Sequence, residues 1–132
     1  MSRPRLYVNL PVDDLARSVA FFTALGFAFD ARFTDDTATC MIVGDDSFVM
    51  LLTRRFFQRF TRKLVCDRAC TEVILCLSQP DRAAVDAMVA RARAAVRESH
   101  ASVACARPWA PQGDAYNALQ SNACISKEVP CN

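Results

Sequence analysis

Cysteine and histidine are the side chains best suited to metal binding and nucleophilic chemistry, and this sequence holds seven cysteines but a single histidine, His100. Cys66 and Cys70 lie four residues apart and could share one face of a helix, where they would bind zinc together with His100 or Cys105. Their spacing matches no established zinc-binding pattern. No Ser-His-Asp or Cys-His arrangement is supported, and the three glycines form no phosphate-binding loop. The sequence therefore names no catalytic residue.

The cysteines do not predict a disulfide framework. Their odd total of seven, the absence of a Cys-x-x-Cys pair and the lack of an export signal argue against one. Cys40 and Cys76 fall within strand-like apolar runs, where a thiol behaves as a small hydrophobic side chain. We expect both to be buried.

The densest positive charge lies at residues 54–63, where four arginines and one lysine are interleaved with aromatic residues. Phe56, Phe57 and Phe60 could stack on nucleic-acid bases. Their helical spacing favours the alternative, an amphipathic helix that buries its aromatic face. The net charge of the chain is +2, which makes no strong electrostatic case for nucleic acid.

The composition is that of one globular domain. A chain of 132 residues can bury a real core, and 52% hydrophobic with 23% charged residues is an ordinary soluble balance. No apolar run approaches the roughly 20 residues of a membrane span, and the N-terminus is too short and polar for a signal peptide. We expect a cytoplasmic protein with no membrane and no nucleic acid among its partners.

The elements that would position a site begin with a strand and a helix. Residues 5–10 alternate, and the apolar side of this strand comprises Leu6, Val8 and Leu10. Pro11 lacks an N–H group and is expected to end the strand. Asp13 or Asp14 can cap the helix, whose apolar face comprises Leu15, Val19, Phe22 and Leu25. Gly26 then suits a left-handed C-terminal cap.

Three further strands are predicted at residues 27–33, 37–43 and 47–53, separated by turns rich in aspartate and glycine. They form an antiparallel meander. The unit over residues 5–53 is therefore βαβββ, and a short helix is expected from residue 54 to about 62.

The same order restarts after a linker that reaches residue 70. A strand is predicted at residues 71–78, and Pro80 suits the first turn of the helix that follows, with Ser78 or Asp81 as its cap. The apolar face of that helix comprises Val85, Met88, Val89, Ala92 and Val96. The sequence thus predicts a second βα unit over residues 71–96.

A family resemblance rests on the first helix and its flanks. The residues that carry it are Val12, Asp14, Leu15, Ser18, Phe21, Phe22, Leu25, Gly26 and Phe27. They resemble the opening signature of the vicinal oxygen chelate superfamily, which includes glyoxalase I, bleomycin-resistance proteins, fosfomycin-resistance enzymes and extradiol dioxygenases. The resemblance implies an α+β glyoxalase-like fold, a single domain over residues 1–132 with one complete βαβββ module and an incomplete second one.

The resemblance stops near residue 96. The family implies three more strands, a glycine-rich turn and a late Asp-Pro-x-Gly-His-x-Trp-Glu motif whose glutamate is commonly a metal ligand. Residues 97–132 show no such motif, no sustained alternation and one glycine. We expect an irregular tail, either native or the product of a frameshift. Within it, residues 101–106 could pair weakly as a strand and residues 116–119 could form a helical turn.

The chemistry of the superfamily needs a divalent metal, held by His, Gln or Glu from several strands, that acts as a Lewis acid toward vicinal oxygens. By position, the family's ligands fall on Tyr7 and Leu51, with Glu72 near the ligand position of the second module. Leu51 cannot coordinate a metal. A divalent metal is implied by the resemblance, but its ligands are largely missing, and we expect no cofactor.

What remains is a cup lined by Tyr7, Asn9, Val49, Leu51 and Thr53, apolar with a few polar groups, which suits a small-molecule ligand. The candidate substrate-binding residues are Tyr7, Asn9, Leu51 and Glu72. Two functions stay open. One is a small-molecule-binding protein without a complete metal site, as in the bleomycin-resistance branch; the other is a metal-dependent lyase or dioxygenase resembling lactoylglutathione lyase.

Because an incomplete module exposes a sheet edge and an apolar face, we also expect a homodimer.

Overall fold

The computed structural model describes residues 2–67, 69–70, 72–99, 105–108 and 121–126. The chain divides into two compact units, Met1–Val65 and Cys66–Asn132, each with its own sheet. Within the described residues, no helix combines the length and the apolar character needed to cross a bilayer.

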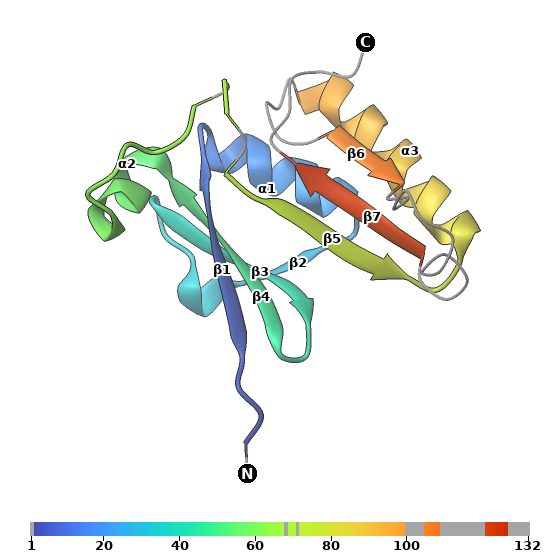
Figure 1. The fold of residues 1–132 in the computed structure, drawn as a ribbon, viewed down its shortest axis with the longest axis horizontal. Helices are drawn as coiled ribbons and strands as arrows, with labels where there is room; N and C mark the ends of the chain where they lie inside the picture. The colour runs from blue at the N-terminus through green and yellow to red at the C-terminus, as the bar shows by residue number, and fades with distance from the viewer. Residues whose placement is uncertain (1, 68, 71, 100–104, 109–120, 127–132) are drawn as a thin grey trace. The chain divides into compact units, whose positions relative to one another are not determined.

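The first unit has the βαβββ order that the sequence predicts (Figure 1). Its elements are β1 (Leu6–Val12), α1 (Leu15–Ala24), β2 (Ala28–Asp30), η1 (Ala31–Phe33), β3 (Ala38–Gly44), β4 (Ser47–Thr53), α2 (Arg54–Phe57) and η2 (Gln58–Phe60). The sheet has the order β1-β4-β3-β2, in which β1 and β4 are parallel and the other pairs antiparallel. The α+β fold class and the βαβββ module are thereby confirmed.

Helix α1 begins and ends at the residues that its sequence marks. The carboxylate of Asp14 accepts a hydrogen bond from the backbone N–H of Arg17 at 2.9 Å, so Asp14, not Asp13, is the cap. At the other end Gly26 has a φ of 98°, a left-handed conformation that strains residues with a Cβ. The buried face holds Phe21 and Phe22.

Two strand predictions are wrong in detail. Pro11 does not end β1 but pairs in register with Leu52. The missing N–H group is tolerated because β1 is an edge strand with a neighbour on one side only. β2 stops at Asp30 instead of reaching Phe33, because the Asp30 carboxylate accepts from the backbone N–H of Arg32 at 3.0 Å and starts the turn η1.

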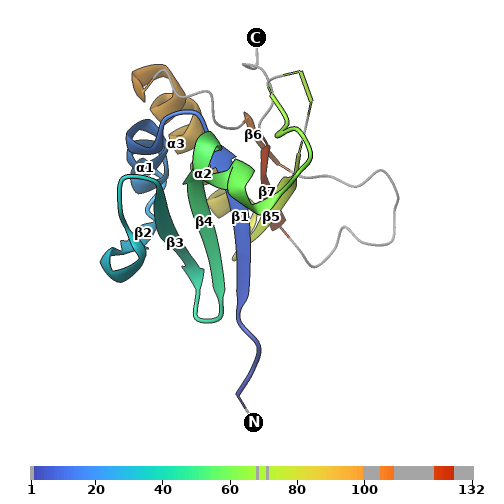
Figure 2. The same ribbon diagram turned by 90° about the vertical axis from the view of Figure 1, so that its left-hand side faces the viewer.

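The two faces of the first sheet differ in burial. Cross-strand register places Val49, Leu51 and Thr39 on one face with Leu10, and all four side chains are buried. Helix α1 lies against this sheet, as Figure 2 shows, and its two buried phenylalanines complete an apolar core. Burial of this face contributes apolar stabilisation to the unit.

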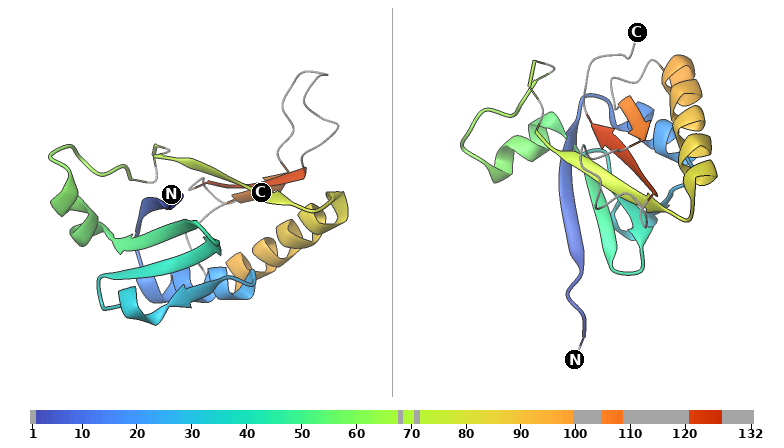
Figure 3. Two further views of the ribbon diagram at one scale, coloured as in Figure 1. Left: turned by 90° about the horizontal axis from the view of Figure 1, so that it is seen from below. Right: turned by 45° about the vertical axis from the view of Figure 1, so that its right-hand side comes forward.

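The second unit comprises β5 (Ile74–Gln79), α3 (Arg82–Ser99), β6 (Cys105–Pro108) and β7 (Ser121–Ser126) (Figure 3). Asp81 caps α3 by accepting from the N–H of Ala84 at 2.8 Å. The predicted helix face is buried at Val85, Met88, Val89 and Ala92, with Ala95 in place of the half-buried Val96.

The prediction of an irregular tail is wrong for β7, whereas β6 overlaps the strand expected at residues 101–106 at Cys105 and Ala106 and continues to Pro108. β6 and β7 join β5 in an antiparallel sheet of order β5-β7-β6. Sequence periodicity missed β7 and the C-terminal half of β6 because both strands are short and neither alternates cleanly between polar and apolar residues. The helical turn expected at residues 116–119 lies outside the described residues.

Candidate binding face of the first sheet

The second face of the first sheet is open at one end and closed at the other. Cross-strand register builds it from three rows. The first row is Tyr7, Phe48, Ile42 and Ala28; the second is Asn9, Met50, Cys40 and Asp30; the third is Pro11, Leu52 and Ala38. The third row is buried, whereas the first two rows keep exposed or half-buried side chains on β1 and β4. We call these first two rows the open face.

An aromatic pair dominates the open face. The rings of Tyr7 and Phe48 stack with centroids 4.9 Å apart and 15° between their planes. Tyr7 is 45% exposed and Phe48 is half-buried, so the pair presents ring surface to solvent. Ile42 extends the apolar surface across β3, and Asn9 adds an exposed amide that can donate and accept hydrogen bonds. This mixture is typical of surfaces that bind flat organic molecules.

An ion pair lies at the β2 end of the second row. The guanidinium of Arg32 makes two hydrogen bonds to the Asp30 carboxylate, at 3.0 and 2.7 Å. The side-chain bonds from Arg32 lower the pKa of Asp30, and the same bonds raise the pKa of Arg32, with a smaller contribution from Tyr7. Both groups are therefore charged at neutral pH, and the Asp30 carboxylate is ion-paired with Arg32.

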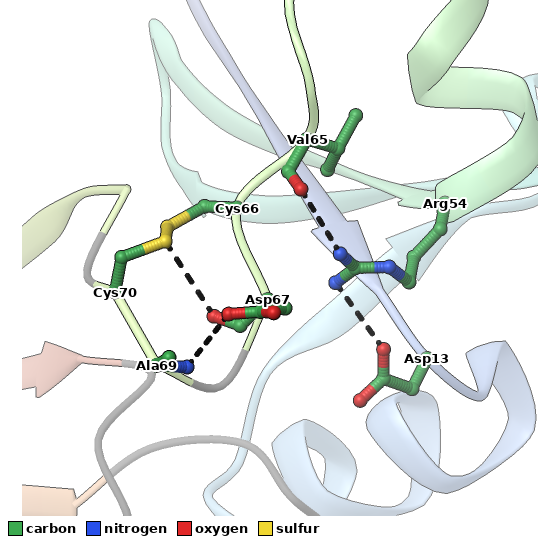
Figure 4. Close-up of a disulfide and its surroundings, with 7 residues drawn as sticks. All are labelled: Asp13, Arg54, Val65, Cys66, Asp67, Ala69 and Cys70. Carbon is green, nitrogen blue, oxygen red and sulfur yellow. Dashed lines mark hydrogen bonds and ion pairs between the residues drawn. A yellow bond between two sulfur atoms is a disulfide. The ribbon is translucent and has the colours of Figure 1, made fainter.

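The four cysteines between residues 40 and 76 have three different environments. Cys40 is buried, as predicted, and burial raises the pKa of its thiol, with Asp30 as a second cause. Cys76 is exposed, so the prediction that it is buried is wrong. Cys66 and Cys70 form a disulfide with their Cα atoms 5.8 Å apart (Figure 4), a bond that the sequence did not lead us to expect. The turn between them is held by the Asp67 carboxylate, which accepts from the N–H of Ala69 at 2.8 Å.

The structure separates the four candidate binding residues. Tyr7 and Asn9 share the open face, but Leu51 is fully buried on the opposite face. Val49 and Thr53, which alternate with Leu51 along β4, lie on that opposite face too. The predicted lining of the cup is therefore wrong for β4, because the residues that share a face with Tyr7 are offset by one position from those predicted. Glu72 belongs to the second unit, two residues before β5.

Sequence reasoning missed Phe48 and Met50, the β4 residues that do share the open face with Tyr7. The cause is the sequence of β4, SFVMLLT, which is apolar at consecutive positions and so has no readable alternation. The signal that would have located them is the parallel register of β1 and β4, which sequence periodicity does not provide.

The first module matches a known protein family profile over part of its length. The family profile described as bleomycin resistance protein-like N-terminal matches residues 6–44, the stretch from β1 to the end of β3. The match supports the resemblance of the first module to the vicinal oxygen chelate, or glyoxalase-like, superfamily.

Among solved structures, this chain is similar to the hypothetical protein SA1046 from S. aureus. The two share 26% sequence identity at a TM-score of 0.63, over 86% of this chain and 81% of the other. No curated protein matches the chain.

The metal that the glyoxalase-like superfamily implies does not fit the donor set of the first sheet. The residues that share the open face on β1 and β4 are Tyr7, Asn9, Phe48 and Met50, which include no carboxylate and no imidazole. Asp30, on β2, is neutralised by Arg32. Throughout the described part of the chain, no group of three or more His, Cys, Asp or Glu side chains could hold a metal ion.

Proposed function

We propose that this chain is a small-molecule-binding member of the glyoxalase-like superfamily without a complete metal site. The observation that carries the proposal is the stacked, solvent-accessible pair of Tyr7 and Phe48 on a face whose positions on β1 and β4 hold no carboxylate and no imidazole. A ligand with a flat aromatic group would stack on this pair, and each such contact is worth about 1 kcal/mol beyond the area that it buries. Asn9 would fix its orientation through the amide.

The bleomycin-resistance-like match makes bleomycin a suitable first probe. In a calorimetric titration with metal-free bleomycin, we expect binding that weakens about tenfold in Phe48→Ala, since truncating an aromatic anchor typically costs 1–2 kcal/mol. Phe60→Ala is the matched control. It removes an aromatic ring that is 70% exposed, in the same unit but outside the open face. Equal losses in the two variants, or no binding by the unchanged chain, would contradict the proposal.

The alternative is a metal-dependent lyase or dioxygenase of the same superfamily. It needs a stoichiometric metal, and Glu72 is the residue of the second module that the family resemblance places near a ligand position. Titration with nickel, zinc and manganese separates the two functions. Micromolar or tighter binding that disappears in Glu72→Ala would favour the enzyme, whereas the proposed function predicts no such site.

A further inference from the structure

Residues 54–64, which we call the basic segment, concentrate positive charge. They hold 5 of the 16 basic residues of the chain and none of the 14 acidic ones, so the rest of the chain has 11 basic and 14 acidic side chains. Arg55, Arg59, Arg62 and Lys63 are exposed. The positive charge of this protein is therefore local to one segment of the first unit.

The same segment exposes its apolar side chains. Leu64 is 97% exposed and Phe60 is 70% exposed, the two highest values for large hydrophobic residues in the described part of the chain. The prediction of a helix that buries its aromatic face is thus wrong for Phe60. The reason is that α2 ends at Phe57 and continues as the short 3-10 turn η2, which breaks the helical periodicity before Phe60.

Hydrogen bonds hold the segment in this shape. The side-chain amide of Gln58 donates to the carbonyl oxygens of Thr61 and Lys63 at 3.0 and 2.9 Å. At its base, the guanidinium of Arg54 pairs with Asp13 at 3.4 Å and donates to the carbonyl of Val65 at 3.3 Å, as Figure 4 shows. The exposed side chains therefore project from an ordered turn.

The rings within the segment also contact one another. Phe56 and Phe60 meet edge to face at 5.3 Å, and Arg59 lies over the Phe56 ring at 5.8 Å. These contacts leave Leu64 and most of Phe60 in water, which is costly for apolar surface unless something covers it.

We propose that the basic segment binds the surface of an anionic lipid bilayer, which goes beyond the ligand-binding function proposed for the open face and replaces the expectation, drawn from the sequence, of no membrane partner. Phe60 and Leu64 would enter the boundary between headgroups and acyl chains, while Arg55, Arg62 and Lys63 contact lipid phosphates. Clustered basic residues beside exposed apolar side chains are the combination that such surfaces attract.

Two other occupants fit less well. Nucleic acid would use the aromatic rings for base stacking, but the most exposed apolar residue is Leu64, which has no ring. A second copy of the chain, in a two-fold interface, would place this segment against itself and bring like charges together.

The test is co-sedimentation of the full chain with two kinds of vesicle, phosphatidylcholine alone and an equal mixture with phosphatidylglycerol, at near-physiological salt. We expect binding to the mixed vesicles only. Phe60→Ser with Leu64→Ser should reduce the partition coefficient by about tenfold or more, since burying one such side chain is worth at least 1.5 kcal/mol. Both side chains are exposed, so the fold should be retained.

The role of charge is tested with two double variants, each of which removes two positive charges. Arg55→Gln with Arg62→Gln should weaken partition about 25-fold, at about fivefold for each charge removed from the surface. Arg91→Gln with Arg93→Gln, on α3, should leave it within about twofold. Equal losses in the two pairs, or undiminished binding without Phe60 and Leu64, would overturn the proposal. Tighter binding to a single-stranded oligonucleotide than to vesicles, or a dimer that Leu64→Ser dissociates, would overturn it in favour of another partner.

Discussion

The ring of Tyr7 on β1 stacks on the ring of Phe48 on β4, at 4.9 Å and 15°, and the two residues are direct partners in the parallel register of these strands. The pair thus links the edge strand to its neighbour β4 in the sheet. It also forms the aromatic part of the open face. One contact therefore contributes to both the stability of the first unit and the surface proposed for ligand binding.

We predict a measurable coupling between these two side chains. In a double-mutant cycle of Tyr7→Ala and Phe48→Ala, the coupling free energy of unfolding should be about 0.5–1 kcal/mol, the usual range for a cross-strand aromatic pair. Urea denaturation of the four proteins gives the value. Additive single and double mutants would show that the stacking contributes nothing to stability.

Gly26 and Gly44 offer a matched test of backbone strain. A Cβ at either position would meet nothing within 4 Å, but only Gly26 has a left-handed φ, of 98°. Gly26→Ala should therefore lower the free energy of unfolding by about 1 kcal/mol. Gly44→Ala should change it by less than about 0.5 kcal/mol. Similar urea midpoints for the two variants would show that the conformation of Gly26 is not costly for alanine.

The parts of the first unit that sequence predicts well are those in which a local interaction decides the outcome. A cap at Asp13 or Asp14, the left-handed Gly26 and the full extent of β4 were all predictable, because turn chemistry and short-range patterns act within a few residues. The family resemblance then supplied the order of the elements.

The parts that sequence predicts poorly depend on contacts between distant residues. Which face Leu51 occupies depends on the register of β4 against β1, and Pro11 stays in its strand because β1 is an edge. The strands β6 and β7 form by pairing across the second sheet. The same limit explains why Phe48 and Met50, on the open face, were missed.

The Asp35 turn should make the first unit sensitive to acid. The Asp35 carboxylate accepts hydrogen bonds from the Thr37 hydroxyl and N–H, both at 2.7 Å, and from the Ala38 N–H at 3.0 Å. These bonds, with that of the Thr37 side chain first, lower the pKa of Asp35. Below about pH 3.9 the unfolded chain binds this proton more readily than the folded one. The stabilisation is thus complete above that pH and is lost as pH falls through the lower, folded-state pKa.

Asp35→Asn should accordingly flatten the decrease in urea midpoint between neutral pH and about pH 3, relative to the unchanged chain. Asp36→Asn removes the same charge one position along and is the control, because Asp36 is exposed and accepts none of the three bonds that define the turn. An equally steep acid transition in Asp35→Asn would show that other carboxylates dominate the pH dependence.

The last prediction concerns the thiols. Cys40 is 2% exposed and burial raises the pKa of its thiol, so it should resist alkylation until the first unit unfolds. Cys76 is exposed and should react with iodoacetamide in the folded protein. Cys66 and Cys70 should react only after a dithiol reductant has opened their disulfide, with a mass gain of about 2 Da before alkylation. Peptide mass spectrometry, with Cys76→Ser to assign the fast site, measures all three rates. Rapid labelling of Cys40 in the folded chain would mean that the second row of the open face is more accessible than its burial implies.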